Sequence, residues 1–315
     1  MKVPPERNNP AAVLEGRDRA RITLAGKQVV LTNLDKVFWP RTELTKRDLL
    51  RYYIRVAPAL LPHLRQRAMV MKRYPNGIEG AFFFMKRAPS VRPDWLETCS
   101  IRHASASVIA FPVVNDLAAL LWVVNLGCID LNPWYAQCDD TGRPDYLHFD
   151  LDPVPGAGFT QVTETALVVR EALGKLKLRS FVKTTGSRGF HVYVPIVRGP
   201  LQKQVWTVAR SIAKELEAAH PTLITAEYRK AKRPPGRVLV DYNQNAWGRT
   251  LASVYSVRPR PGAPVSTPVT WEEVERGVRI EDFHLGNVPD RLAGLGDLWK
   301  PLTLQRGRCR LEPLL

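Results

Sequence analysis

The chain has 315 residues, of which 45% are hydrophobic and 24% are charged, a normal globular mixture that is large enough to build a sizeable core. No stretch approaches the roughly 20 apolar residues of a membrane helix, and the first residues lack an apolar signal-peptide core. We therefore expect a cytoplasmic, nucleoid-associated protein with no membrane partner. Lys and Arg number 46 against 30 acidic residues, and the net charge of +16 favours nucleic acid as a partner over an inert basic surface.

The first part of the chain predicts a tail and two strand pairs. Residues 1–20 are polar and contain several prolines, so we expect a flexible tail followed by a single domain over residues 21–315. Two apolar runs flank an Ala-Gly-Lys turn within residues 21–40, and a Pro-Asn-Gly turn lies within residues 68–89. Each pattern indicates a β-hairpin.

An amphipathic helix is predicted between these two hairpins. Thr45 is a suitable N-cap, and apolar side chains then recur at helical spacing. These apolar positions are Leu49, Tyr53, Val56 and Leu60. Pro58 and Pro62 are expected to bend or end the helix, because proline lacks the N–H group that a helix interior uses.

The rest of the chain alternates strands with helices. A strand at residues 106–114 precedes an apolar helix that should end near Gly127, and another strand follows at residues 145–151. The later predicted elements are amphipathic helices around residues 160–173 and 205–216, a strand pair within 180–196, strands at 236–243 and 252–258, and short helical pieces in the last third. Because the alternation is not strict, we predict a mixed α/β (α+β) fold.

The sequence HFDLDPVPG, residues 148–156, carries the first candidate site. Side chains on a strand alternate between faces, so Asp150 and Asp152 share one face at about 6.5 Å along the strand. Two carboxylates this close repel unless a divalent cation such as Mn²⁺ or Mg²⁺ binds them. The Pro-Gly break places them at a strand end, where α/β sheets bind ligands. A solvent-exposed aspartate pair at a turn is the alternative.

A glycine-rich loop, TTGSRGFH at residues 184–191, joins two predicted strands. Its glycines and Ser187 can present backbone N–H groups to phosphate oxygens, and Arg188 adds a cation that suits phosphate. His191 follows on the outgoing strand, where it either contacts a triphosphate or is a satisfied histidine at a sheet edge.

A third carboxylate, Asp241, ends a buried Val-Leu-Val run and needs a partner, which a metal shared with the first two aspartates would supply. Arg258 and Arg260 lie on one face of an extended segment, from which both can reach one triphosphate. Arg260 by itself is equally compatible with a solvated strand end. Three carboxylates, a phosphate-binding loop and an arginine pair together favour nucleotidyl transfer by a pair of metal ions.

The cysteines offer no second site. No CxxC pair occurs among the four cysteines, which are Cys99, Cys128, Cys138 and Cys309. This spacing argues against a structural zinc site and favours unreactive thiols in a reducing compartment.

The order and spacing of several stretches resemble the polymerase domain of bacterial ligase D, within the archaeo-eukaryotic primase superfamily. The resemblance covers about residues 24–299. It rests on NLDKVFWP, LTKRDLLRYY, MKRYPNG, FFFMKRAPS, PVVNDLAALLWVVNLGCIDLNPW, HFDLDP, TTGSRGFHVYVPI, VLVDYNQN and YSVRPR. It implies a primase-like catalytic core with a mixed sheet flanked by helices, and one primase-polymerase domain over residues 21–315.

The resemblance also implies roles for individual positions. The ligands of the metal, expected to be two Mn²⁺ or Mg²⁺ ions, would be the catalytic Asp150, Asp152 and Asp241. The incoming nucleotide would be bound by Ser187, Arg188, His191, Gln244, Arg258, Arg260 and Asn132. The 5′-phosphate of a downstream DNA strand would be bound by Asn33, Lys36 and Lys46. The template base would contact Phe83 and Phe84, since aromatic rings stack on nucleobases.

Asn132 departs from the family pattern, because many members have a histidine there. An amide can hydrogen-bond a phosphate or a sugar but cannot donate a proton to a reacting group, which argues against an acid–base role at this position. The basic residues of the segment 228–236 cannot be matched one by one with the arginine of the family.

The function that the resemblance implies is template-directed nucleotidyl transfer, with ribonucleotides preferred, in bacterial non-homologous end joining. Its substrates would be nucleoside triphosphates and DNA gaps or double-strand ends that carry a 5′-phosphate. The chain is expected to be a free-standing polymerase that acts with the Ku end-binding protein and a separate ATP-dependent DNA ligase. Two alternatives stay open: a non-catalytic module that binds the 5′-phosphates of DNA ends, and a primase that starts strands de novo.

Overall fold

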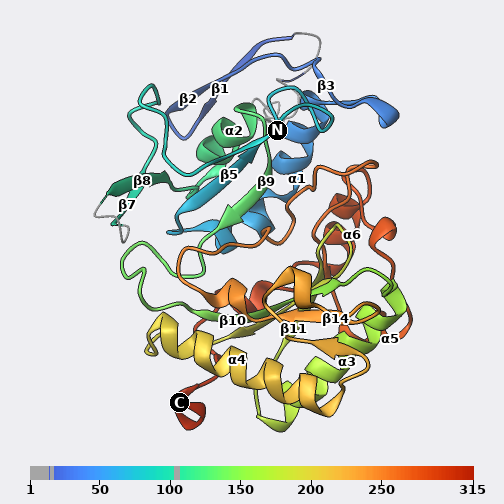
Figure 1. Cartoon of the computed structure of the whole chain (residues 1–315). Helices are drawn as coiled ribbons and strands as arrows, with labels where there is room; N and C mark the ends of the chain where they lie inside the picture. Colours follow the sequence, from blue (N-terminus) through green and yellow to red (C-terminus); the bar gives the residue numbers. More distant parts are fainter. Residues whose placement is uncertain (1–13, 15–17, 103–106) are drawn as a thin grey trace, which may run out of the picture.

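The chain forms two main β-sheets, one in each half of the molecule (Figure 1). The computed structural model describes residues 14, 18–102 and 107–315. The tail expected over residues 1–20 therefore lies almost entirely outside the described residues. Leu14 is buried in the core, and Ala20 already begins the first strand.

The N-terminal half is built on a three-stranded antiparallel sheet in the order β6-β5-β9. Its strands are β5 (Met69–Arg73), β6 (Phe83–Met85) and β9 (Cys128–Pro133). Three further antiparallel pairs are β1 (Ala20–Leu24) with β2 (Lys27–Leu31), β3 (Val37–Trp39) with β4 (Leu44–Thr45), and β7 (Thr98–Arg102) with β8 (Val108–Pro112). The two predicted hairpins, β1–β2 and β5–β6, are thereby confirmed.

Two helices cover this half, α1 (Lys46–Leu64) and α2 (Leu117–Asn125). The Thr45 hydroxyl accepts a hydrogen bond from the backbone N–H of Asp48, and the Asp48 carboxylate accepts one from the backbone N–H of Thr45. This reciprocal capping box starts α1 at the predicted residue. α2 ends just before Gly127, whose φ of +80° is the left-handed conformation that terminates many helices.

The prolines of α1 were expected to bend or end it, and the second alternative is wrong, because the helix continues past both Pro58 and Pro62 to Leu64. Both prolines lie on the exposed side of the helix. The opposite side is fully buried from Leu49 to Leu64. Packing of that apolar stripe outweighs two lost backbone hydrogen bonds.

The C-terminal half is built on a six-stranded sheet in the order β13-β14-β10-β12-β11-β15. Its strands are β10 (Tyr146–Pro153), β11 (Phe181–Thr184), β12 (Phe190–Pro195), β13 (Ile224–Thr225), β14 (Val238–Asp241) and β15 (Pro268–Val269). β13 and β14 are parallel and the other pairs are antiparallel. The predicted mixed sheet with flanking helices is confirmed.

One face of this sheet packs on α3 (Phe159–Lys175) and α4 (Gln202–Ala219), at the bottom of Figure 1. Phe149 and Leu151 of β10 are fully buried, and so is Phe190 of β12, whose ring lies 5.2 Å from that of Phe159 in α3. Because strand side chains alternate, the polar residues of the same strands point to the other face, toward the N-terminal half.

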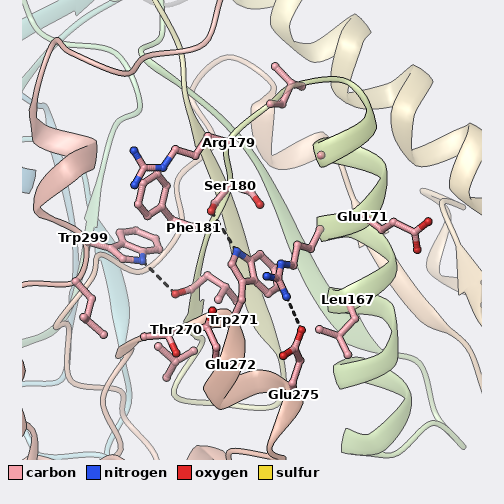
Figure 2. A pocket seen from close by; sticks show the side chains of 16 residues that line it. Leu167, Glu171, Arg179, Ser180, Phe181, Thr270, Trp271, Glu272, Glu275 and Trp299 are labelled. Carbon is pink, nitrogen blue, oxygen red and sulfur yellow. Dashed lines mark hydrogen bonds and ion pairs between the residues drawn. The ribbon is translucent and has the colours of Figure 1, made fainter.

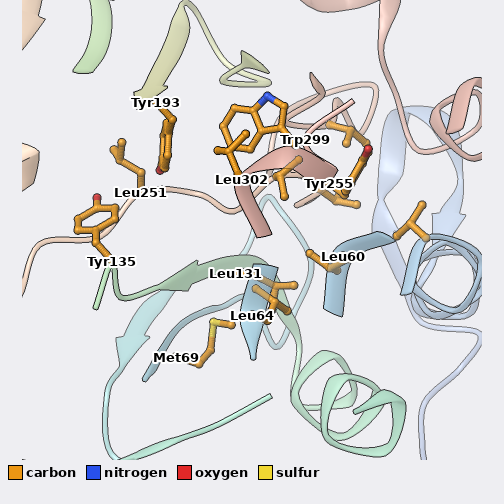
Figure 3. Packing of buried hydrophobic residues seen from close by; sticks show 14 of the residues in the cluster. Leu60, Leu64, Met69, Leu131, Tyr135, Tyr193, Leu251, Tyr255, Trp299 and Leu302 are labelled. Atoms are coloured by element: carbon orange, nitrogen blue, oxygen red, sulfur yellow. The ribbon is translucent and has the colours of Figure 1, made fainter. Parts of the chain in front are cut away.

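A continuous apolar core joins the two halves (Figure 3). Leu64 of α1 and Leu131 of β9 belong to the same buried cluster as Tyr193, Tyr255 and Trp299 from the C-terminal half. The two sheets are therefore held in a fixed relation to each other, which gives a site between them a defined geometry.

The strand predicted at residues 252–258 is not formed; the segment is a turn with one isolated bridge, from Val257 to Val265. Tyr255 adopts a φ of +59°, which a strand does not allow. The segment instead runs between the two sheets, where Ser253 N–H donates to the Leu131 carbonyl. The backbone N–H and C=O groups of this segment form hydrogen bonds with several separate partners instead of with one neighbouring strand.

The last part of the chain contains the short helical pieces that were predicted. They are α5 (Trp271–Glu275), α6 (Val288–Leu295) and 3₁₀ turns up to Glu312–Leu314. All four cysteines are free thiols. In the described part of the chain, no helix is both long and apolar enough to cross a membrane.

Candidate active site

Four polar side chains form a row across the C-terminal sheet. Lys183 of β11 lies opposite His191 of β12, His191 lies opposite Asp150 of β10, and Asp150 lies opposite Asp241 of β14. Asp152 follows two residues after Asp150 and shares its face. Directly opposite residues have β-carbons about 4.5–5.5 Å apart, so the strand register gathers the three predicted aspartates at one place.

The surroundings of these aspartates disfavour their negative charge. Burial raises the pKa of Asp150 to about 6. Burial, followed by the charge of Asp150, raises the pKa of Asp152 to about 6 and also raises that of Asp241. Carboxylates that share a site and raise one another's pKa values are ready to take up a cation.

By donor chemistry, this trio fits a divalent cation, since carboxylate oxygens are the preferred ligands of Mg²⁺ and Mn²⁺. The described residues nevertheless contain no group of three His, Cys, Asp or Glu side chains already closed around a cation position. The Asp241 carboxylate instead accepts hydrogen bonds from Gln244 Nε2 at 2.9 Å and from the Asn243 backbone at 2.8 Å. The backbone register nevertheless holds Asp150 and Asp241 at directly opposite positions.

His191 is not a satisfied histidine at a sheet edge, because β12 lies between β10 and β11 in the sheet and the side chain is only 3% exposed. Its Nε2 lies 3.3 Å from Asp150 Oδ1, and its Nδ1 lies 2.6 Å from Lys183 Nζ. Burial and the neighbouring Lys183 hold the His191 pKa well below its usual range. The ring is therefore neutral and donates one N–H.

The glycine-rich loop is organised by Thr185, which sequence reasoning missed. The backbone N–H groups of Ser187, Arg188 and Gly189 all donate to Thr185 Oγ1 at 3.1 Å. The expectation that these N–H groups point at phosphate is therefore not met in this structure. The loop presents its side chains instead: Arg188 is exposed, and its guanidinium lies 3.9 Å from Asp152.

Glycine is required at two positions of this loop by close backbone approach. A β-carbon at Gly189 would lie 1.8 Å from the backbone oxygen of Leu151, and one at Gly186 would lie 2.7 Å from the Arg258 side chain. These contacts place the loop directly beside the aspartates of β10 and beside the predicted arginine pair.

A second row of side chains, one aromatic and the others polar, faces the first from the N-terminal sheet. Phe84 of β6 lies opposite Lys72 of β5, and Lys72 lies opposite Asp130 of β9. Asn132 follows two residues after Asp130 on the same face, where it is 7% exposed and donates to the Asp130 carbonyl. Lys72 and Asp130 were not predicted, although the period of two on their strands places them on this face.

The arginine segment bridges the two rows. Arg258 Nη1 donates to the Thr185 carbonyl at 2.6 Å, and its Nε lies 3.4 Å from the buried carboxylate of Asp130. Arg260 is exposed, and its backbone carbonyl accepts a hydrogen bond from Trp39 Nε1.

Between the rows lies a polar cleft of ≈ 300 Å³. Its lining residues are Lys72, Phe84, Asp130, Asn132, Asp150, Asp152, Thr185, Ser187, Arg188, His191, Thr250, Leu251, Ala252, Arg258 and Arg260. Six of the seven predicted nucleotide-binding residues thus line one cleft. Gln244 does not line it, but it donates to Asp241, which stands opposite Asp150. Basic side chains beside unneutralised carboxylates suit a polyanion that arrives with its own cations.

An exposed aromatic surface continues from this cleft. Phe82, Phe83 and Phe84 are 51%, 44% and 60% exposed, and Lys72 Nζ lies 4.3 Å from the Phe82 ring centroid. Phe82 also stacks on Tyr74 at 5.3 Å. Solvent-exposed rings interleaved with cations are typical of surfaces that stack nucleic acid bases; only Phe83 and Phe84 were predicted.

The predicted 5′-phosphate residues form a separate cluster. Lys36 N–H donates to the Asn33 carbonyl, and Lys46 N–H donates to the Lys36 carbonyl. Lys46 Nζ donates to the Thr32 carbonyl at 2.7 Å, and Lys36 Nζ donates to Asn76 Oδ1 at 2.6 Å. Burial, followed by the charge of Lys36, lowers the pKa of Lys46 to about 8. The charge of Asp18 opposes this effect only in part, so a bound phosphate would stabilise the charge of Lys46 further.

A larger cavity of ≈ 850 Å³ lies elsewhere, between α3, β11 and α5 (Figure 2). Several of its polar groups are already partnered: Arg170 pairs with Glu275 at 2.6 Å, and Trp271 Nε1 donates to the Ser180 carbonyl. It shares no lining residue with the polar cleft and contains none of the predicted site residues.

Comparisons with known proteins show the family to which the chain belongs. Residues 45–299 match the family model described as the LigD primase-polymerase domain. The chain is 36% identical over 278 residues to the multifunctional non-homologous end joining protein LigD of Mycolicibacterium smegmatis, covering 88% of this chain and 36% of that protein. It is 30% identical over 266 residues to the bifunctional LigD of Bacillus subtilis, covering 84% and 42%. The chain thus spans well under half the length of these relatives.

The structural comparison extends over nearly a whole solved domain. The polymerase domain of Mycobacterium tuberculosis Ligase D, solved in complex with DNA, superposes with a TM-score of 0.82 at 32% identity, covering 87% of this chain and 98% of that one. Sequence and fold therefore agree over most of the chain, and it belongs to the family of LigD primase-polymerase domains.

Proposed function

We propose that the chain is a template-directed nucleotidyltransferase that fills gaps and extends DNA ends in non-homologous end joining. The observation that carries this proposal is the register that places Asp150, Asp152 and Asp241 together beside a cleft lined by basic side chains. Family membership and the likeness to a polymerase domain solved with DNA support the same reaction class.

The three aspartates would hold the divalent cations, for which we propose two Mn²⁺ or Mg²⁺ ions. When bound, such cations activate the primer 3′-hydroxyl for attack on the α-phosphate and stabilise the charge of the departing pyrophosphate. The protein then needs no general base of its own. His191, with its lowered pKa, acts as a hydrogen-bond donor rather than as an acid.

The side chains that line the cleft would hold the triphosphate and the sugar. Arg258 is already oriented by the Thr185 carbonyl and by Asp130, so little side-chain entropy is lost when it meets a phosphate. The further contacts to the nucleotide would come from Ser187, Arg188, His191, Gln244, Arg260 and Asn132. Preference for ribonucleotides over deoxyribonucleotides is part of the proposal.

DNA would be held on both sides of the reacting nucleotide. Phe83 and Phe84 would stack on the template base, and the cluster of Asn33, Lys36 and Lys46 would bind the 5′-phosphate across a gap. We propose that Ku delivers such ends and that a separate ATP-dependent DNA ligase seals the filled product.

The test is primer extension on a gapped duplex with a 5′-phosphate, in the presence of Mn²⁺ and either ribonucleotides or deoxyribonucleotides. Asp150→Ala and Asp241→Ala should each lose more than about 100-fold in extension rate, since even indirect damage to a metal site costs 10–100-fold. Asp140→Ala is the matched control, because Asp140 pairs with Arg143 outside the cleft.

Two outcomes would redirect the assignment. Extension by Asp241→Ala at the parental rate would defeat the metal-dependent reaction and leave a DNA-end binding module. Efficient synthesis on single strands without a primer would assign a de novo primase instead.

A further inference from the structure

Lys183 is fully buried in the middle of β11, yet the function above assigns it nothing. Its Nζ makes three contacts: His191 Nδ1 at 2.6 Å, Ser266 Oγ at 2.5 Å and the Ala252 carbonyl at 3.0 Å. It does not itself line the cleft, but two of its partners do, the His191 ring and the Ala252 carbonyl. A buried lysine without a carboxylate contact requires an explanation, because burying an ammonium group is costly.

Counting donors settles what Lys183 does at each contact. The Ala252 carbonyl can only accept, and the Ser266 hydroxyl gives its own proton to the Thr184 carbonyl at 2.9 Å, so it accepts as well. An ammonium group has three N–H donors and no lone pair, which matches three acceptors. Burial, followed by the charge of Arg258, lowers the pKa of Lys183 well below its usual range, and the charges of Asp150 and Asp130 act in the opposite direction. The geometry favours the ammonium form, because its three N–H groups satisfy all three contacts.

The contacts of His191 also indicate that Lys183 is the donor and His191 Nδ1 the acceptor. The Asp150 carboxylate near Nε2 is an acceptor, so Nε2 carries the ring hydrogen. Nδ1 is then the unprotonated nitrogen and accepts from Lys183. The strand register keeps Lys183, His191 and Asp150 in one line, so the arrangement does not depend on a mobile loop.

We propose that Lys183 is a positioning residue of the active site: by donating to Nδ1 it locks His191 as the Nε2–H tautomer, so that an N–H rather than a lone pair lies beside Asp150 in the cleft where the nucleotide phosphates would bind. The part concerning the nucleotide rests on the proposed function, whereas the tautomer does not. In the other tautomer the Nε2 lone pair would face the anions and repel them. Fixing the Nε2–H tautomer therefore makes the interaction of His191 with an anion attractive and fixes the orientation of the ring.

The first experiment measures the tautomer directly in the unmodified protein. Two-bond ¹H–¹⁵N correlation of histidine-labelled full-length chain, with His191 assigned by its absence in His191→Asn, should show protonated Nε2 and unprotonated Nδ1 at neutral pH. Protonated Nδ1 in the parent protein overturns the proposal, whatever any variant does. The measurement needs no polymerase activity, so it remains decisive if the proposed function fails.

The second experiment removes the donor with Lys183→Met, which keeps most of the buried volume. We expect the Nδ1 signal to shift and the KM for the nucleotide to rise by about 10-fold, in line with other residues that orient a ligand indirectly. Affinity for gapped DNA should stay unchanged, which separates positioning from general structural damage. Addition of a nucleoside triphosphate with Mg²⁺, without primer, should shift the Nε2–H signal in the parent more than in Lys183→Met.

The matched control is Thr165→Val in α3, which also removes a fully buried polar group but packs on the helical face of the sheet. Its His191 signals and nucleotide KM should equal those of the parent. If Lys183→Met leaves both the Nδ1 signal and the KM unchanged, Lys183 does not position His191 and the proposal fails.

Discussion

Replacing Asp150 by Asn should stabilise the metal-free protein while abolishing nucleotidyl transfer. Asp150 is 13% exposed at its side chain and stands opposite both Asp241 and His191. Asparagine has nearly the same shape, and its Oδ1 can still accept from His191 Nε2. The substitution therefore removes a charge that the fold disfavours and keeps the main contact.

The magnitude follows from the pKa of Asp150, which burial raises from 3.8 to about 6. Each pKa unit corresponds to about 1.4 kcal/mol, so the buried charge costs at most about 3 kcal/mol at neutral pH. The folded protein retains this proton up to about pH 6 and the unfolded chain only up to about pH 4. The folded state thus binds more protons in between, and stability falls as pH rises through that window.

Chemical denaturation of both proteins at about pH 7 and about pH 5 tests this reasoning. We expect Asp150→Asn to gain about 1–3 kcal/mol at the higher pH and to lose roughly half of that advantage at the lower pH, where Asp150 of the folded parent is neutral but the carboxyl of the unfolded chain is still ionised. A variant that is no more stable than the parent at about pH 7, or a gain that is the same at both pH values, would refute it.

Four further outcomes are expected. Protons compete with cations for the aspartates of β10, so Mn²⁺ affinity measured by calorimetry should fall below about pH 6; an affinity that is constant down to about pH 5 would contradict this. The preference for 5′-phosphate over 5′-hydroxyl ends, measured by fluorescence anisotropy, should decline as Lys46 loses its charge above about pH 8, whereas Lys46→Arg should keep the preference; the same decline in both proteins would exclude Lys46 as the cause. Gly189→Ala should lower the free energy of unfolding by about 3 kcal/mol or more, because its β-carbon would lie 1.8 Å from a backbone oxygen of β10; near-parental denaturation would show that the loop can move away. Phe84→Ala should weaken gapped-DNA binding by about 1–3 kcal/mol, as for other base-stacking rings; unchanged affinity would place the template elsewhere.

Local chemistry made most of the elements predictable. Thr45 and Asp48 form the capping box that starts α1, and the alternating apolar and polar residues of β10 place Asp150 and Asp152 on one face. Such signals act over a few residues and do not depend on the rest of the fold. The prolines of α1 show where local signals fail, because a buried stripe on the opposite side outweighs them.

The glycine-rich loop shows a different failure. Its composition correctly indicates tight backbone approach, but the partner of its N–H groups is Thr185 Oγ1, a side chain within the loop itself. The path of the loop between β11 and β12 decides which acceptor these N–H groups bind. That path is set by Leu151 and Arg258, which lie far away in the sequence.

By itself, the sequence determined the basic charge, the mixed strand and helix pattern, and the pairing of two aspartates on one strand, since each follows from composition or from a period of two or 3.6 residues. Only the tertiary structure decided that Asp241 stands opposite Asp150, that Lys183 stands behind His191, and that Lys72 and Asp130 face them from a second sheet. The physical reason is that packing of the opposite, apolar faces fixes strand order and register. The neighbours of each polar side chain therefore depend on contacts between distant parts of the chain, which a local sequence pattern does not reveal.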